Sequence, residues 1–446
     1  HRQAQKKEAG LLFELVTDYL NGIYSNLVYI ENGKLNIQNR QNQELQGFFE
    51  TDFTFSLTDF TLDSTSLQRT DKFFYATNFD LDFSNFNMRL IDDLHKLEMG
   101  RVRVSSLNQQ VQIENLQLQP VPENVTMQTM RQFNRSELYN ISVPKINLGG
   151  VDLNDAFFNK KLKINHFEIT DPAIYFENFG ALRTNRQKVD LNEFYNLIFN
   201  YVEDFDINRF SVPGGKITWV NHTRKGRTTS FDNGFSASLF NFRLNENELN
   251  KQRLFFSDDF DITIKNQQFG LSDSVHILKA GEIRFSSARS TVSLKNGLLY
   301  PVITSEKYSE LPTTFQISIP ELTIWNFDFQ EAYYSQKPKI ELLEIDSPKF
   351  QIYNQTGKAK SLDLKKYQQF PLPEFIHSLQ LESFNINNAE VVTYQTQGID
   401  HRATANFRFN LSLPGVNVKN EGNQAQLSSS NILLNITDFK VPLGEK

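Results

Sequence analysis

Alternation of apolar and polar residues is the dominant pattern along this 446-residue chain. Apolar side chains take every second position in stretches such as Phe79–Phe83 and Asp261–Lys265. A period of two predicts β-strands with one apolar and one solvated face, which is typical of antiparallel sheets. Turn-forming residues at Asn108–Gln109, Gly149–Gly150 and Pro213–Gly215 interrupt these stretches at hairpin spacing.

Two stretches depart from this alternation and have helical spacing. Apolar residues recur at intervals of three and four from Leu11 to Leu20 and from Leu191 to Tyr201, which predicts one amphipathic helix in each. We expect each helix to lead into a strand that ends at a glycine-containing turn, Asn32–Leu35 in the first case and Gly214–Ile217 in the second. A third segment of this kind, near Lys365–Pro373, contains prolines that oppose a continuous helix.

The chain also repeats itself at a long period. The stretch Phe73–Val121 aligns without a gap with Leu254–Val302, at the constant offset that takes Gly100 to Gly281. The match continues on both sides with small changes of spacing, as expected where loops differ in length, and a partial third copy begins near Leu362. We therefore expect a fragment of a longer array, with a first repeat over residues 1–188, a second over 189–361 and a partial third over 362–446.

A long sheet with one apolar face must curl, close or be covered by another layer. Three arrangements are open: separate two-sheet sandwich domains, a closed barrel, or an open trough. The 40 phenylalanines of the chain would overfill a small barrel, and no linker rich in Pro, Gly and Ser separates the copies. We favour the trough, a mostly β fold in which an elongated antiparallel sheet curls into an open groove with about one helix per repeat.

Composition excludes several functional classes. A formal net charge of −6 has the wrong sign for a protein that follows a nucleic-acid backbone. The absence of cysteine excludes disulfides, thiolate nucleophiles and cysteine-ligated metal sites. No apolar run approaches the 18 or so residues of a spanning helix, yet 39% hydrophobic residues is too apolar for a disordered chain.

Candidate catalytic groups are scattered and carry no recognisable motif. His95 and His276 coincide under the offset of the alignment, and a residue that recurs at one repeat position is better explained by structure than by half of an active site. The acidic pairs Asp92–Asp93 and Asp258–Asp259 fit solvated turns, and the basic run Arg224–Arg227 fits a hairpin tip. A polysaccharide lyase would need charged residues that converge on one face, whereas the aligned positions are apolar or turn-forming. We expect no enzymatic activity, no metal and no cofactor.

Two segments resemble the repeats of AsmA-like proteins. They are the hairpin of Gly100–Ser106 with Val111–Leu116, and the strand Ile207–Ile217 with its Gly-Lys-Ile ending. AsmA-like proteins are large periplasmic proteins of Gram-negative bacteria, related in plan to TamB and to the bridge-like lipid-transfer proteins. The Asn-, Phe- and Lys-rich composition resembles that of Bacteroidota members.

The resemblance implies a groove, apolar inside, along which phospholipid or another acyl lipid passes between the inner and outer membranes without an enzymatic step. It also implies a periplasmic location, with an inner-membrane anchor in a segment not included in this chain. The partners at the two ends of the array would be the membranes or their proteins.

The candidate lipid-binding residues are the alternating apolar positions of both copies. A surface that binds acyl chains needs only to be apolar and continuous, since each methylene that leaves water contributes about 0.8 kcal/mol. The candidates in the first copy are Phe53, Phe55, Leu57, Phe79, Leu81, Phe83, Val102, Val104, Val111, Ile113, Leu162 and Ile164. Those in the second copy are Phe235, Leu239, Phe260, Ile262, Ile264, Ile283, Phe285, Val292 and Leu294. The alternative interpretation is a dry core, in which case the protein is a scaffold that spans the envelope and braces an outer-membrane machine.

Overall fold

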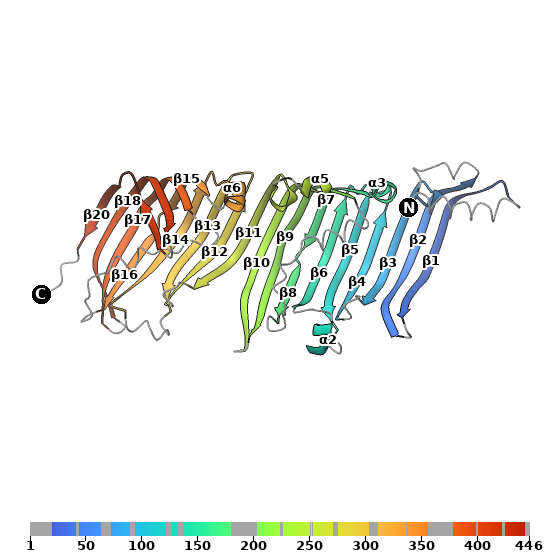
Figure 1. The fold of residues 1–446 in the computed structure, drawn as a ribbon, viewed down its shortest axis with the longest axis horizontal. Coiled ribbons are helices and arrows are strands. Elements are labelled where there is room, and N and C mark those ends of the chain that lie inside the picture. Colours follow the sequence, from blue (N-terminus) through green and yellow to red (C-terminus); the bar gives the residue numbers. More distant parts are fainter. Residues whose placement is uncertain are drawn as a thin grey trace. The chain divides into compact units, whose positions relative to one another are not determined.

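The computed structural model describes most of the chain between residues 20 and 441 (Figure 1). The residues outside the description within that range are 42–43, 64–72, 90–93, 122–126, 133–136, 180–202, 224–225, 250, 252, 271–274, 303–310, 336–337, 356–377, 398–399 and 422–423. The chain divides into two compact units, His1–Asp258 and Asp259–Lys446, and each is described by itself. This division falls within the second predicted repeat.

Ten strands form the sheet of the first unit. They are β1 (Gly22–Gln41), β2 (Glu44–Asp63), β3 (Asn78–Arg89), β4 (His95–Ser105), β5 (Gln110–Pro120), β6 (Glu137–Gly149), β7 (Lys161–Thr170), β8 (Ala173–Asn178), β9 (Asp204–Thr223) and β10 (Gly226–Leu244). The described helical segments of this unit are short. They are η2 (Phe73–Tyr75), α2 (Met127–Gln132), α3 (Leu153–Asn159), α5 (Glu246–Leu249) and η4 (Leu254–Phe256).

The second unit has the same kind of sheet. Its strands are β11 (Asp259–Gly270), β12 (His276–Ser286), β13 (Thr291–Pro301), β14 (Thr313–Trp325), β15 (Lys339–Asp346), β16 (Lys349–Gln355), β17 (Ser378–Gln397), β18 (Asp400–Glu421), β19 (Gln424–Ser428) and β20 (Leu433–Lys440). One short helix, α6 (Phe329–Tyr334), follows β14. The prediction of a mostly β fold is confirmed in both units.

The sheets are mixed, so the expectation of an antiparallel sheet is only partly correct. From β1 to β6 each strand pairs antiparallel with the next, and β6 then pairs antiparallel with both β7 and β8. The strands β7 and β8 pair in parallel with β9, which forms an antiparallel hairpin with β10. In the second unit β15 and β16 pair in parallel with β17 in the same way. Two parallel strands need a crossover connection that returns the chain to the end of the sheet where the first strand began. The alternation of apolar and polar residues does not reveal such a connection.

The strand repeat predicted from the sequence is present in the structure. β3, β4 and β5 correspond to β11, β12 and β13 at the offset of the alignment, and the helices α3 and α6 follow β6 and β14 at equivalent places. The backbone repeats even at its exceptional positions. Asn85 and Asn266 both have a positive φ in mid-strand, of 54° and 57°, and so do Asn115 and Asn296.

Two predicted turns are wrong. Asn32–Leu35 lies inside β1 and Gly214–Ile217 inside β9, so both strands continue through the glycines. The pairing shifts register there, which marks β-bulges rather than chain reversals. Glycine is needed for close approach: a Cβ on Gly33 would lie 2.4 Å from Cζ of Phe53, whose ring covers it. The turns at Asn108–Gln109 and Gly149–Gly150 are confirmed.

The predicted helices of Leu11–Leu20 and Leu191–Tyr201, and the degraded segment near Lys365, fall on residues outside the description, apart from Leu20. The described helices were not predicted, although the sequence places an N-capping aspartate directly before α3 and before α6. The side chains of Asp152 and Asp328 each accept a hydrogen bond from a backbone N–H three residues later, as N-caps do. None of the helices in the described part of the chain is both long and apolar enough to cross a membrane.

Candidate functional site

The pairing register places the candidate residues of the first copy on one face of the sheet. Residues directly opposite one another on neighbouring strands point to the same side. A first row crosses the unit from strand to strand. It consists of Ile30, Phe55, Leu81, Val104, Val111, Leu148, Phe167, Phe210 and Leu239. A second row runs beside it. It consists of Gly33, Phe53, Phe83, Val102, Ile113, Ile146 and Ile169. We call this side the apolar face.

The remaining first-unit candidates join the same face, most of them at the strand ends nearest α3 and Phe235 in mid-strand. Leu57 pairs with Phe79 across β2 and β3. Leu162 and Ile164 pack in one cluster with Val111 and with other members of the first row. Phe235 of β10 pairs with the bulge glycine of β9, in the arrangement that Phe53 has with Gly33.

The second unit repeats both rows. The first consists of Ile262, Phe285, Val292, Ile324, Leu343, Phe384 and Leu413. The second consists of Ile264, Ile283, Leu294, Leu322, Ile345, Ile386, Leu411 and Leu434. Phe260 begins the same face of β11, and its ring lies 5.1 Å from that of Phe329 in α6. The structure therefore brings the candidates together on one face in each unit.

Most of this face is only half-buried. Among the candidates, Leu57, Phe79, Ile164 and Phe260 are buried, and all the others are intermediate in exposure. The described strand pairings in each unit are hydrogen-bonded edge to edge within its sheet. An apolar side chain that is left half-exposed retains part of its hydrophobic transfer free energy for another contact.

The four buried candidates mark where short segments cover the face. Ala76, beside η2, is buried against Leu57 and Phe79, and Leu153 of α3 packs on the same cluster. Ile164 is buried with Val151 and Ile207 under α3. These covers lie at one end of the strands and leave most of the two rows half-buried, although Ile146 and Ile386 in the second rows are buried.

The opposite face of the sheet is polar. Asp82 accepts a hydrogen bond of 2.8 Å from Nε of Arg101, and Asp261 accepts one of 2.9 Å from Nε of Arg284. The hydrogen bond to Asp261 raises the pKa of Arg284 above its ordinary value, because it favours the charged guanidinium. Each sheet thus has one wet face and one apolar face, as the alternation predicts.

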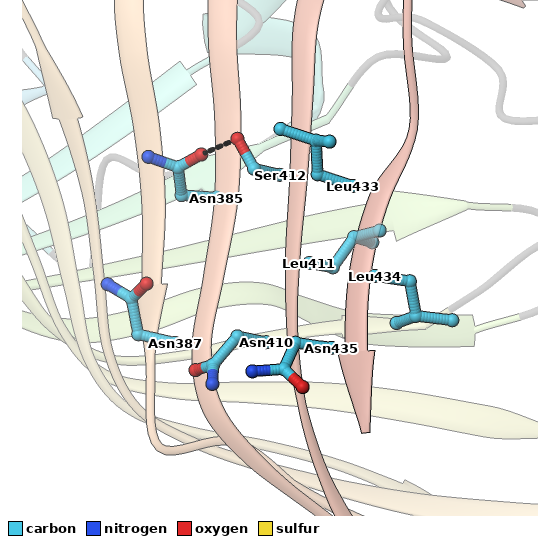
Figure 2. Close-up of a pocket in the computed structure, with 8 residues that line it drawn as sticks. All are labelled: Asn385, Asn387, Asn410, Leu411, Ser412, Leu433, Leu434 and Asn435. Atoms are coloured by element: carbon cyan, nitrogen blue, oxygen red, sulfur yellow. Dashed lines mark hydrogen bonds between the residues drawn. The ribbon is translucent and has the colours of Figure 1, made fainter. Parts of the chain in front are cut away.

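A hollow of about 460 Å³ lies over β17, β18 and β20 (Figure 2). Ser412 donates a hydrogen bond of 2.8 Å to Oδ1 of Asn385 in this hollow. The lining residues are Asn385, Asn387, Asn410, Leu411, Ser412, Leu433, Leu434 and Asn435. Leucines and amides share the lining, and Leu411 and Leu434 also belong to the second row of the apolar face. The hollow therefore borders that face, although none of the candidate residues lines it.

The recurring histidines have structural partners. His95 is 3% exposed, and its Nε2 accepts a hydrogen bond of 3.2 Å from the backbone N–H of Tyr139. His276, at the equivalent position, stacks on the ring of Phe315 with the centroids 4.1 Å apart. Phe315 is the equivalent of Tyr139. His95 at the start of β4 therefore contacts β6, and His276 at the start of β12 likewise contacts β14. Within the described residues no group of three His, Cys, Asp or Glu side chains has the arrangement of a metal site.

The acidic and basic candidates have ordinary surface roles where they are described. Asp258 accepts a hydrogen bond of 2.6 Å from Arg253, which also contacts Glu248 at 2.9 Å. The hydrogen bond from Lys251, followed by that from Arg253, lowers the pKa of Glu248 below its ordinary value. Asp92–Asp93 lies outside the described residues, as do the first two residues of Arg224–Arg227, at the tip between β9 and β10.

Two aromatic pairs at the covered end were missed by the sequence interpretation. Phe74 and Tyr75 have φ angles of 50° and 60°, and Phe255 and Phe256 have 53° and 55°. Bulky residues rarely adopt a positive φ, and each costs about 1–3 kcal/mol unless the surroundings compensate. Phe74 places its ring 5.2 Å from that of Phe55, on the apolar face, although it remains 44% exposed. The sequence marks these two aromatic pairs only through their equivalent positions in the alignment of Phe73–Val121 with Leu254–Val302.

No protein-family model matches the chain, and no curated protein matches it.

Proposed function

We propose that the chain binds the acyl chains of phospholipid or another acyl lipid on its apolar face, and that it transports them. In this proposal each sheet curls into an open groove, the tails lie on the paired rows, and the head groups remain in water. The observation that carries the proposal is the mostly half-buried state of the two apolar rows in each unit, in which η2 and α3 cover candidates at one end of the described strands of the first unit.

The energetics support a lipid tail as the ligand. A tail of roughly 16 methylenes would gain about 13 kcal/mol if it left water completely, at about 0.8 kcal/mol per methylene. A tail that contacts protein on one side only would gain roughly half of that. This is enough for binding, and it requires no directional polar contact along the tail. The tail could therefore slide from one pair of side chains to the next.

The dimensions of the rows also support this ligand. Neighbouring strands are about 4.8 Å apart, so the six strands β2–β7 carry each row over about 24 Å. A bilayer core of about 30 Å holds two opposed tails, or about 15 Å for each. One tail would therefore span about four strands, and the rows are long enough to hold it across the strand direction.

As a transporter of this kind, the chain would act without enzymatic chemistry or a cofactor. We place it in the periplasm, as part of a bridge between inner and outer membranes, with the membranes or their proteins as partners at the ends of the array. The Arg and Asp pairs of the polar face would keep the outside of the bridge hydrated.

Photo-crosslinking tests the proposal directly. Purified chain is mixed with a phospholipid that carries a diazirine at the end of one acyl chain, irradiated and analysed by mass spectrometry. Phe83→Asp and Ile262→Asp each place a carboxylate in a central row, and we expect each to reduce crosslinking in its own unit at least fivefold. Ser84→Asp and Lys265→Asp are controls on the same strands, because Ser84, next to Phe83, and Lys265, three residues after Ile262, point to the polar face. Crosslinking of both should stay within twofold of the wild type.

The crosslinked peptides identified by mass spectrometry should contain residues of the two rows. Labels spread equally over both faces, or unchanged by Phe83→Asp and Ile262→Asp in variants that remain folded, would contradict lipid binding on the apolar face. Failure of Phe83→Asp to fold would instead favour a dry core and the scaffold interpretation.

A further inference from the structure

The outer edge of β1 differs from the edges of its two repeat equivalents. β9 is the counterpart of β1 in the next repeat, and β17 is the counterpart of β9 in the one after. Each of these two later strands is paired on both sides. β1 pairs with β2, and none of the described strands lies on its other side (Figure 1). A long strand edge without a neighbour presents a row of backbone donors and acceptors for pairing.

The partners of β9 and β17 share one design. Each is a strand in two segments, β7–β8 or β15–β16, that runs parallel to its acceptor and breaks at an acidic residue or serine followed by proline. At the break, the backbone N–H of Lys216 donates to the carbonyl of Pro172 at 2.8 Å. The N–H of Glu390 donates to the carbonyl of Pro348 at 2.9 Å. Lys216 of β9 and Glu390 of β17 therefore occupy the same position of the strand that accepts the added strand, and each donates its N–H to the proline carbonyl.

Lys34 occupies this acceptor position in β1. It follows the bulge glycine Gly33 just as Lys216 follows Gly215, and it pairs with Asp52 of β2 on the inner side. Because the bulge recurs, we expect the N–H of Lys34 to point away from β2, as that of Lys216 points away from β10. The side chain of Lys34 is 83% exposed.

Apolar side chains of β1 are exposed where their equivalents are covered. Ile30 is 43% exposed, whereas its equivalent Val212 in β9 is 5% exposed. Leu35 is 38% exposed, whereas its equivalent Ile217 in β9 is half-buried and its equivalent Val391 in β17 is 6% exposed. We attribute the lower exposure of the later residues to the added strand, since Val391 pairs with Phe350 of β16.

We propose that the outer edge of β1 is a strand-acceptor site for a two-segment strand of the β7–β8 type, from a further repeat of this kind. The added strand runs parallel to β1, its apolar residues cover Ile30 and Leu35, and its proline carbonyl accepts the N–H of Lys34. Main-chain hydrogen bonds supply affinity in such strand addition, and alternate side chains supply specificity. The proposal does not depend on lipid binding.

A labelled peptide tests this site on the full chain. The peptide has the sequence of residues 161–178, KLKINHFEITDPAIYFEN, and its binding is measured by fluorescence anisotropy without lipid. Lys34→Pro removes the N–H at a strand edge, where proline is tolerated, and Lys34→Ala removes only the side chain. We expect Lys34→Pro to weaken binding at least tenfold and Lys34→Ala to change it less than threefold. Circular dichroism of both variants establishes that the sheet is retained.

A control peptide with Asp in place of Phe167 and Ile174 should bind at least tenfold more weakly, because these two residues pair with Phe210 and Ile217 of β9, the equivalents of Val28 and Leu35 in β1. Equal binding to wild type and Lys34→Pro, or no binding of the first peptide at 1 mM, would overturn the proposal. Self-association of the chain that Lys34→Pro abolishes, but that the peptide does not compete with, would also overturn it and make a whole second copy the occupant.

Discussion

Two positions on one strand test how the apolar face is covered. Phe79 and Phe83 both lie on β3 and point to the apolar face. Phe79 is 3% exposed beneath Ala76 and Phe74, whose ring is 5.7 Å away, whereas Phe83 is half-buried in the second row. We predict that Phe79→Asp and Phe83→Asp differ sharply in their effect on stability.

The expected magnitudes follow from the two environments. Removal of a buried phenylalanine ring costs about 3–5 kcal/mol, and an unpaired buried carboxylate adds several more. Phe79→Asp should therefore consume most of the roughly 5–15 kcal/mol by which a typical domain is stable. At Phe83, about half of the 1.5–3 kcal/mol of ring burial is lost and the carboxylate keeps its water. We expect Phe83→Asp to cost about 0.8–1.5 kcal/mol.

Urea unfolding followed by circular dichroism measures both free energies of unfolding. Hydrogen exchange of β2–β5 then assigns the change to the first unit. Similar, large losses for both variants would refute the account, because they would mean that Phe83 lies in a sealed core. A small loss for both would mean that η2 and α3 do not cover the face.

Three further predictions concern local features of the first unit. Asn85 has a φ of 54° in mid-strand, so Asn85→Val should destabilise by about 1–2 kcal/mol in urea unfolding, whereas Asn85→Gly should be nearly neutral. A Cβ on Gly215 would lie 2.7 Å from Cε1 of Phe235, so Gly215→Val should lower the free energy of unfolding by about 1–3 kcal/mol. The lowered pKa of Glu248, chiefly from its hydrogen bond with Lys251, stabilises the fold above the ordinary carboxyl value of 4.5. This contribution is lost as the pH falls through the lowered pKa, so thermal unfolding of Glu248→Gln should depend less on pH below about 4.5 than that of the wild type.

The sequence was most informative where structure depends on near neighbours. The alternation in Phe79–Phe83 and in Val111–Ile113 predicted β3 and β5, since side chains of a strand alternate between faces whatever the rest of the chain does. The internal alignment predicted the strand repeat, because equivalent residues meet equivalent partners. Within strands, Asn85 and Gly33 interrupt the alternation through bulges, and glycine and asparagine suit bulges as well as turns.

The features that were missed depend on distant segments. The parallel pairing of β7–β8 with β9 depends on where the chain returns after Asn178, which the pattern of neither segment specifies. Whether Phe83 is sealed or half-buried depends on the presence of another layer, and an alternating pattern is the same in both cases. Phe74 and Tyr75 keep their positive φ angles where their rings contact Phe55 and Phe60 of β2, although propensity opposes such angles.

Native mass spectrometry of the purified chain, without detergent, tests the central claim most directly. The chain is titrated with a phospholipid below its critical micelle concentration. The mass of bound lipid is compared for wild type, Phe83→Asp and Ser84→Asp. We predict that wild type and Ser84→Asp hold lipid through the desolvation of the protein, and that Phe83→Asp holds at least fivefold less. Folded wild-type chain with no bound lipid, or equal binding by all three, would contradict an acyl-chain site on the apolar face.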